Sequence, residues 1–270
     1  MPAQGLPRDL RTTTPHTARM YDYYLGGKDN YPADREAAEA VRSVLPHIKV
    51  TARSTREFMH RATRWFTARG IRQFLDIGTG IPTEPNLHQV AQREAPEARV
   101  VYVDHDPIVL AHADALLRST PEGRTEYLHG DVRAPRDIVG SEELTRTLDL
   151  SQPLALSMNA LFHFVPDEDD PIGIIRELVE PLAPGSYVSL THVTADFLDP
   201  EEAAKAIDVY RKGGIPAQVR DRTEFEALFA GLELVDPGIT PTYRWHPDGP
   251  PRQDETDATT SMYAGVALKK

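Results

Sequence analysis

The amino-acid sequence predicts a doubly wound, Rossmann-like α/β fold. From residue 71 onward, short runs of β-branched and other apolar residues alternate with segments of helix length, which is typical of a mostly parallel sheet covered by helices. The first run, Gln73–Ile77, contains an acid and continues into two closely spaced glycines, Gly78 and Gly80. Glycines at a strand end let the backbone turn tightly and approach a ligand, although the same turn also occurs without one.

A helical cap is expected before this sheet. Residues 1–14 are rich in proline, threonine and charge and have no apolar period, so we expect a flexible tail there. Helices are expected over Thr17–Leu25, Ala33–Val44 and Ile48–Ala68. The chain would then divide into the tail, an N-terminal helical cap over residues 15–70 and a Rossmann-like domain over residues 71–270.

The sheet itself is expected to combine parallel strands with an antiparallel edge. Late in the chain, Leu232–Val235 and Met262–Leu268 are expected to pair as an antiparallel hairpin, with a loop over residues 245–259. The acidic run at residues 167–170 is expected to start a helix, because carboxylates favour a helix N-terminus. The parallel strands are expected at Gln73–Ile77, Val100–Asp104, Thr125–His129, Leu154–Met158 and Tyr187–Thr191.

Acids mark the ends of three successive predicted strands: Asp76, Asp104 and Asp131. Asp104 follows the glycine turn by roughly the 20 residues at which an acid meets a ribose in dinucleotide-type folds. Asp104 and Asp131 are each equally well explained as a helix cap or turn residue. Asp106, just before Pro107, is the better candidate for a cap, which leaves Asp104 for a ligand.

The glycine turn favours one kind of cofactor. A nicotinamide or flavin fingerprint requires a third glycine where this chain has Thr83, preceded by Pro82, which argues against a dinucleotide. Asp76 stands two residues before Gly78 and suits a ligand with an amino group near the loop. S-adenosylmethionine has that group.

These residues resemble the class I S-adenosylmethionine-dependent methyltransferases. Residues 76–83, which read DIGTGIPT, are similar to the first motif of that class, in the form carried by a bacterial family of uncharacterised methyltransferases. Residues 18–31, 103–107 and 161–167 also resemble that family, and the resemblance extends from about residue 15 to the C-terminus. It implies a methyltransferase sheet with an antiparallel edge pair, and S-adenosylmethionine as the cofactor.

The resemblance also implies a set of cofactor-binding residues. Asp76, Gly78 and Gly80 would line the methionine end and Asp104 the ribose, while Asp131 and Val132 would meet the adenine. Thr79 and His105 lie within the same motifs and join the set. Asn159, where many relatives are apolar, is either a local polar substitution or a site residue, and we include it among both the cofactor-binding and the catalytic candidates.

The tyrosine-rich motif near the N-terminus has two interpretations. Tyr21, Tyr23 and Tyr24 followed by Gly26 are typical of a packed amphipathic helix with a glycine C-cap. Alternatively the motif is a lid, in which Arg19 and Tyr21 close over the cofactor. Both interpretations place the segment in the helical cap.

Two histidines are candidate general bases, because methyl transfer requires a positioned acceptor and, for some acceptors, removal of a proton. His163 and His192 lie at or just after predicted strand ends. The alternative for each is a buried histidine hydrogen-bonded to the backbone. No metal site is predicted, since Asp104, His105 and Asp106 are sequence neighbours that rarely converge on one ion.

The composition of the chain limits the classes of binding partner and the cellular location that we expect. The 270-residue chain has no cysteine and a formal net charge of −11, so we expect a cytoplasmic protein without disulfides and consider nucleic acid an unlikely partner. Six arginines between residues 53 and 72 are expected on a solvated helix face. No apolar stretch suits a membrane span, and a small-molecule acceptor is the default expectation, with the oligomeric state open.

Two other function classes stay open. One is a nucleotide- or NAD-binding oxidoreductase on the same sheet, which NAD(H) binding would reveal. The other is a non-catalytic sensor that binds S-adenosylmethionine or S-adenosylhomocysteine and signals through the cap. Such a sensor would bind the cofactor without transferring a methyl group.

Overall fold

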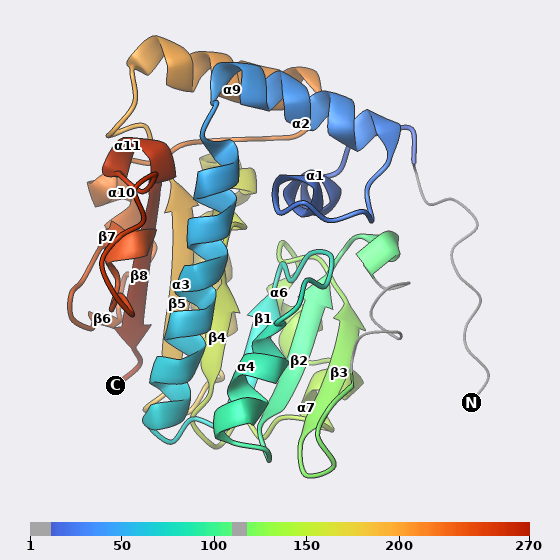
Figure 1. Ribbon diagram of the computed structural model, residues 1–270. Coiled ribbons are helices and arrows are strands. Elements are labelled where there is room, and N and C mark those ends of the chain that lie inside the picture. The colour runs from blue at the N-terminus through green and yellow to red at the C-terminus, as the bar shows by residue number, and fades with distance from the viewer. Residues whose placement is uncertain (1–11, 110–117) are drawn as a thin grey trace.

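One mixed β-sheet organises the protein, as seen in a computed structural model that describes residues 12–109 and 118–270 (Figure 1). Within these residues the strand order is β3-β2-β1-β4-β5-β8-β6, and β7 also pairs with β8. The strands are β1 Gln73–Ile77, β2 Arg99–Asp104, β3 Arg124–His129, β4 Ala155–Met158, β5 Tyr187–Val193, β6 Glu233–Leu234, β7 Thr240–Pro241 and β8 Met262–Leu268.

Strands β1 to β5 are parallel, and β8 runs antiparallel to β5 and to β6. Leu75 of β1 is in register with Val101 of β2 on one side and with Leu156 of β4 on the other. The strand order therefore reverses between β1 and β4, and open α/β sheets bind ligands at such a switch point, beyond the carboxyl ends of the strands. The predicted doubly wound sheet with an antiparallel C-terminal part is confirmed.

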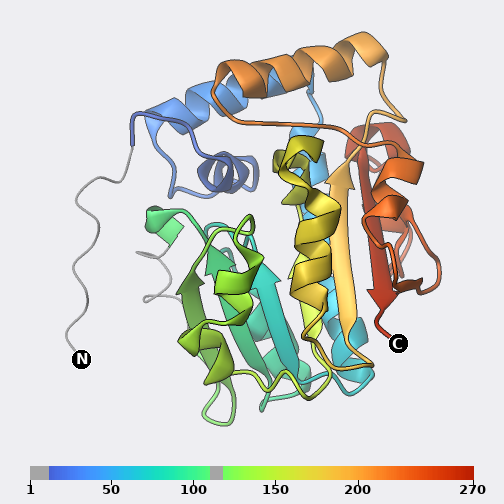
Figure 2. The same ribbon diagram turned by 180° about the vertical axis from the view of Figure 1, so that it is seen from behind.

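Helices cover both faces of the sheet and one of its ends. Figure 1 shows α3 and α4 on one face, and Figure 2 shows α8 with α6 and α7 on the other. Helices α1, α2 and α9 lie across the carboxyl ends of the parallel strands. The helices named here are α1 Thr17–Tyr24, α2 Pro32–Val44, α3 Ile48–Ala68, α4 Leu87–Glu94, α6 Pro135–Val139, α7 Glu142–Thr145, α8 Pro171–Val179 and α9 Pro200–Lys212.

The remaining helices are short. They are α10 Arg222–Ala227, α11 Asp257–Thr260 and the 3-10 turns η1 Phe162–Phe164, η2 Asp167–Asp169 and η3 Thr242–Arg244. The acidic run does start a helix, because Asp170 caps α8 by accepting a hydrogen bond from the Gly173 amide at 3.0 Å. None of the helices in the described residues is long and apolar enough to cross a membrane.

Two local expectations need correction. The stretch at residues 245–259 is a loop, as expected, as far as residue 256, but its last residues begin α11, which Thr256 caps by accepting from the Thr259 amide at 3.1 Å. The arginines of α3 were expected to be solvated, but Arg61 is buried, because its guanidinium donates to the Trp245 and Thr242 carbonyls at 3.0 and 2.6 Å. Most of the expected flexible tail lies outside the described residues.

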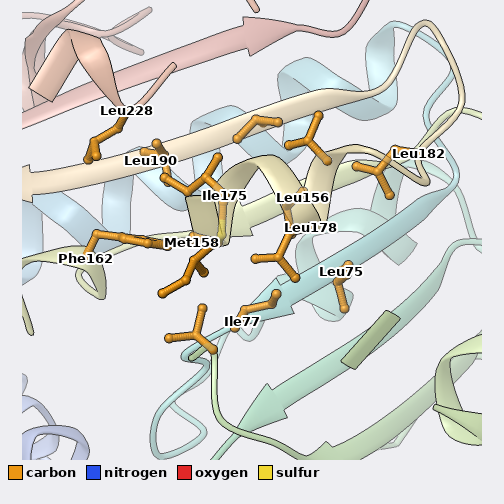
Figure 3. Packing of buried hydrophobic residues seen from close by; sticks show 14 of the residues in the cluster. Leu75, Ile77, Leu156, Met158, Phe162, Ile175, Leu178, Leu182, Leu190 and Leu228 are labelled. Atoms are coloured by element: carbon orange, nitrogen blue, oxygen red, sulfur yellow. The ribbon is translucent and has the colours of Figure 1, made fainter. Parts of the chain in front are cut away.

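Apolar side chains pack in separate clusters around the sheet. Figure 3 shows Leu75 and Ile77 of β1 with Leu156 of β4, packed against Ile175 and Leu178 of α8. Burying each such side chain stabilises the fold by about 1.5–3 kcal/mol. A second cluster fills the space between the sheet and α3, and includes Phe58, Phe66, Phe74, Val100 and Trp245. A third, under α2 and α9, includes Met20, Tyr24, Ala38, Val41, Ala52 and Ile215.

Candidate active site

A cavity is lined by residues at the carboxyl ends of β1, β2 and β4 and by residues of α1 and α9. Figures 1 and 2 show that these helices lie across this end of the sheet. This is the switch point of the sheet, where a ligand is expected. Several residues predicted from the sequence meet in its wall: Tyr21, Asp76, Gly78, Thr79, Gly80, Asp104, His105, Asn159 and His163. Four other predicted site residues, Arg19, Asp131, Val132 and His192, are not among the residues that line it.

The glycine turn after β1 has the conformation that only glycine adopts readily. The φ angle is +75° at Gly78 and +65° at Gly80. A Cβ atom on Gly78 would lie 2.9 Å from Cδ1 of Leu161 across the cavity wall. The amides of Gly78 and Thr79 donate to the Val103 carbonyl at 2.8 and 3.2 Å, so the turn is held against β2.

Asp76 is a half-buried carboxylate at this turn. Burial raises its pKa to about 6, while hydrogen bonds from Ser157 and Thr79 and the charge of Arg56 oppose that rise. A carboxylate that is ionised at neutral pH in a poorly solvated place favours a nearby cation. Asp76 is therefore suited to bind an ammonium group.

Arg56 of α3 lines the cavity beside Asp76, and the sequence analysis did not assign it to the site. Its Nη2 atom donates to the carbonyls of Thr83 and, at 2.9 Å, of Pro85, so it is fixed against the loop that follows the glycine turn. Burial lowers the pKa of this guanidinium, and the neighbouring Asp76 counteracts that effect.

The helical spacing of apolar residues in α3 is a sequence signal that could have identified Arg56 as a residue on the buried face. Arg56 falls on the same face of α3 as the buried Ala52, Met59 and Thr63, at helical spacings of three and four residues. That spacing places the guanidinium on the sheet side of the helix.

Asp104, at the end of β2, lines the cavity and also holds the glycine turn. Its Oδ2 accepts from the Gly80 amide at 2.7 Å, and its Oδ1 accepts from the Asp106 amide at 3.0 Å. Asp106 accepts from the Ile108 amide at 2.9 Å, in line with the expected capping role. Asp104 is thus not left free of protein contacts, but each carboxylate oxygen has a second lone pair available for a hydroxyl donor.

Three predicted cofactor contacts are engaged elsewhere. Arg19 is buried, with guanidinium nitrogens 3.4 Å from Asp34 and 3.6 Å from Asp106, so these two acids hold it away from the cavity. The Asp131 carboxylate is half exposed and accepts from the Arg133 amide at 2.9 Å. Val132 is buried in the apolar cluster against the sheet, which is where an apolar side chain gains most.

Tyr21 and His105 both line the cavity, and each contacts a residue of the helical cap. The Tyr21 hydroxyl donates to the Ala52 carbonyl at 2.9 Å, which joins α1 to α3. His105 places its Nε2 atom 3.2 Å from Nε2 of His16, at the start of α1. The first contact lies within the helical cap, and the second connects the cap to the residue that follows β2.

The two candidate bases differ sharply. His163 lines the cavity, and its buried Nδ1 atom has no hydrogen-bond partner among the described residues. Its pKa lies well below the usual value because the ring is buried, with smaller effects of His192 and Arg220. The ring is therefore neutral near pH 7, with one nitrogen lone pair unprotonated.

His192 lies behind the cavity wall with both nitrogens engaged. Its Nε2 is 2.7 Å from Nη1 of Arg220, and its Nδ1 is 2.7 Å from the Val193 carbonyl. Since arginine only donates, Nε2 accepts and Nδ1 carries the hydrogen. Burial lowers the pKa of His192 to about 3. This is the buried, backbone-bonded histidine that the sequence analysis gave as the alternative to a base.

The end of β4 completes the wall. Asn159 donates from Nδ2 to the Ser157 hydroxyl at 2.8 Å and accepts from Ser189 at 3.4 Å. Ala160 has a φ angle of +52°, and the Thr191 hydroxyl accepts from its amide at 2.7 Å. A left-handed alanine is strained, and such strain is common at functional sites.

No metal-binding group is evident in residues 12–109 and 118–270, where no cluster of three or more His, Cys, Asp or Glu side chains has the geometry to hold an ion.

Comparisons with known proteins agree with this geometry. The chain is 49% identical to a DUF574 family protein from Streptomyces avermitilis, with a TM-score of 0.94 over 97% of this chain and all of that one. It is 36% identical to a candidate methyltransferase from Thermobifida fusca, with a TM-score of 0.87 over 98% of each chain. TnmH, at 18% identity and a TM-score of 0.51 over 97% of this chain and 66% of that one, is similar in fold alone.

A search of curated proteins finds no match. The model of the S-adenosyl methyltransferase family, however, matches residues 3–270, nearly the whole chain. The chain therefore belongs to the S-adenosyl methyltransferase family and is an S-adenosylmethionine-dependent methyltransferase.

Proposed function

We propose that the protein transfers the methyl group of S-adenosylmethionine to a small molecule bound in the same cavity. The observation that carries this proposal is the placement of Asp76 and Arg56 side by side at the glycine turn. A carboxylate and a guanidinium at one end of a cavity match the ammonium and carboxylate groups of an amino acid.

The residues of the cavity fit this cofactor. Asp76 would bind its ammonium group and Arg56 its carboxylate, while Asp104 would accept from the ribose hydroxyls. Gly78 and Gly80 leave the turn without side chains, so Leu161 can pack directly against the turn at Gly78. Asn159 is held by Ser157 and Ser189 and would contribute its amide at the same end. When bound, S-adenosylmethionine supplies a methyl group on a positively charged sulfur. The neutral thioether that remains after transfer is a good leaving group.

The chain then has to orient the acceptor and take up its proton. His163 is the proposed general base, because its neutral ring lies in the cavity wall. His192 is proposed as a positioning residue. It binds Arg220, whose Nη1 donates to the Phe162 carbonyl at 3.0 Å and thereby fixes η1, which carries His163. We further propose that residues 15–70 act as the cap and residues 71–270 as the cofactor-binding part.

The test is calorimetric titration of the protein with S-adenosylmethionine and S-adenosylhomocysteine. We expect binding to the wild type and a loss of about 10- to 100-fold in Arg56→Gln, the cost of an unpaired carboxylate. Arg64→Gln is the matched control, since Arg64 lies on the same helix but pairs with Asp248 at the surface. Equal losses in both variants, or binding of NAD(H) in place of S-adenosylmethionine, would overturn the proposal. Cofactor binding without methyl transfer to any of a broad acceptor panel would indicate a sensor.

A further inference from the structure

The cavity is also lined by residues of α9 and of other elements away from the glycine turn, and this part of it is here called the acceptor compartment. Its wall is formed by α1, the start of α3, η1 and α9. Helix α9 presents two small buried residues, Ala203 and Ala206, to it, so this side of the helix leaves space. The larger side chains of the compartment are Tyr24, Leu45, Ile48, Phe164, Ile207 and Tyr210.

Charge is segregated along the cavity. In the described part of the chain, the carboxylate and guanidinium groups that line it are those of Arg56, Asp76 and Asp104. All three lie at the cofactor end, where they contact the glycine turn or the loop after it. The acceptor compartment has no such group among the described residues. A charged ligand would lose its hydration there without gaining a counter-ion, which costs several kcal/mol.

The compartment is rich in aromatic rings. Phe164 and Tyr210 lie with ring centroids 5.7 Å apart at an angle of 61°, and His163 lies 4.2 Å from Phe164 at 60°. Tyr24 lines the same space. Rings in edge-to-face arrangements interact favourably beyond their buried area, so a further flat ring gains more here than a flexible or saturated skeleton of the same size.

Two side chains in this wall, Tyr24 and His163, each have a buried polar atom without a partner among the described residues. His163 lines the cavity next to Phe164 and is about nine-tenths buried, and its buried Nδ1 atom has no partner among the described residues. The amide of Gln218 is already paired with Asp167, by bonds of 2.8 and 3.0 Å. A donor that approaches these rings would meet the Tyr24 hydroxyl or His163, and of the two only the imidazole can take up the proton of a ligand hydroxyl.

From this segregation of charge, the ring cluster and the position of His163, we propose that the acceptor is an uncharged aromatic hydroxyl compound. It would bind with its ring against the side chains of Tyr24, Phe164 and Tyr210 and its hydroxyl toward His163. This assignment names the acceptor class of the proposed methyl transfer and rests on that function, but ligand binding tests it separately.

The experiment is titration of the protein, saturated with S-adenosylhomocysteine, with three compounds. These are 2-naphthol, its saturated analogue decahydro-2-naphthol and the anion 2-naphthoate. We expect 2-naphthol to bind at least about tenfold more tightly than either of the others. Equal or tighter binding of 2-naphthoate would overturn the uncharged acceptor, and equal or tighter binding of decahydro-2-naphthol would overturn the aromatic one.

Two tryptophan substitutions on one helix locate the binding. Ala206→Trp fills the compartment and should weaken 2-naphthol at least about tenfold, whereas Ala204→Trp, at an exposed position of α9, should leave it within about twofold. Unchanged 2-naphthol binding in Ala206→Trp would overturn the proposal. Ala206→Leu gives the same readout with less overpacking if the tryptophan variant does not fold.

Cofactor binding separates the two proposals. Affinity for S-adenosylhomocysteine should be unchanged in Ala206→Trp and Ala204→Trp, because α9 contributes no charged group to the cofactor end. If the wild type fails to bind S-adenosylhomocysteine, the proposed function fails. The 2-naphthol series then still reports on the compartment by itself.

Discussion

Replacing Asp76 with asparagine should stabilise the free protein while lowering its affinity for the cofactor. The pKa of Asp76 is raised from 3.8 to about 6, chiefly by burial. One pKa unit corresponds to about 1.4 kcal/mol, so the ionised carboxylate costs the free protein about 3 kcal/mol at neutral pH. Asparagine has the same shape without the charge. Allowing for weaker hydrogen bonds from Ser157 and Thr79, we expect a net gain of about 1–2 kcal/mol.

The sign of this effect depends on pH in a definite way. A raised carboxyl pKa means that the folded protein binds a proton more tightly than the unfolded chain does. The cost of the ionised group is therefore fully present above about pH 6 and disappears as the pH falls from about 6 toward 3.8. The stabilisation by Asp76→Asn should be largest at neutral pH and should shrink on acidification.

Thermal unfolding measures both halves of this prediction. At about pH 7.5 the free Asp76→Asn protein should melt about 2–6 °C above the wild type, a gap that should narrow at about pH 5. The rise in melting temperature on adding S-adenosylhomocysteine should be smaller than in the wild type, because an amide cannot pair with an ammonium group. Asp131→Asn, at a half-exposed acid away from the cavity, is the control. An unchanged cofactor affinity, or a free protein that melts earlier at neutral pH, refutes the reasoning.

Three further predictions follow from the same geometry. Cofactor affinity of the wild type, measured by calorimetry, should fall about tenfold between pH 7 and pH 5 as Asp76 takes up a proton, and should stay level in Asp76→Asn. Gly78→Ala should lose at least about tenfold in cofactor affinity, because its Cβ would enter the wall, whereas Gly231→Ala, with φ of +82° but open space around it, should only lower the melting temperature. His163→Ala should stay folded and lose at least about 100-fold in turnover of a hydroxyl acceptor. His192→Ala should unfold at lower temperature, since it removes a buried ring and one hydrogen-bond acceptor of Arg220, which keeps its ion pair with Asp167. Equal turnover in His163→Ala and the wild type would remove the base from the proposal.

Local sequence signals were enough for most of the fold. Helix α3 and strands β1 and β8 have the predicted ends, because apolar periodicity and flanking glycine, proline or acidic residues mark them within the chain. Two short elements were missed. Strand β7 exists through its pairing with β8, and α11 depends on the Thr256 cap, so both are stabilised by contacts that a window of a few residues does not reveal.

The same distinction separates the predicted from the missed site residues. Asp76, Gly78 and Gly80 could be predicted because the turn that they form is continuous in sequence, and all three line the cavity. Arg56 was missed because its role depends on how α3 packs against the loop at residues 83–85, a contact across nearly 30 positions. Arg19 was assigned to the cofactor because nothing in the sequence shows that Asp34 and Asp106 lie beside it.

The architecture also gives the two ends of the cavity different physical constraints. The cofactor end is built from strand ends that are fixed by the sheet and from Arg56 of α3, and Asp104 bonds the glycine turn to β2. The acceptor compartment is walled by α1, the start of α3 and α9, whose apolar side chains pack in a cluster separate from those of the sheet. A change in α9 can therefore alter the shape of the compartment without disturbing the sheet that holds the charged groups. If the proposed acceptor lies against α9 and the cofactor at the glycine turn, substitutions in α9 should change acceptor specificity while cofactor affinity is kept.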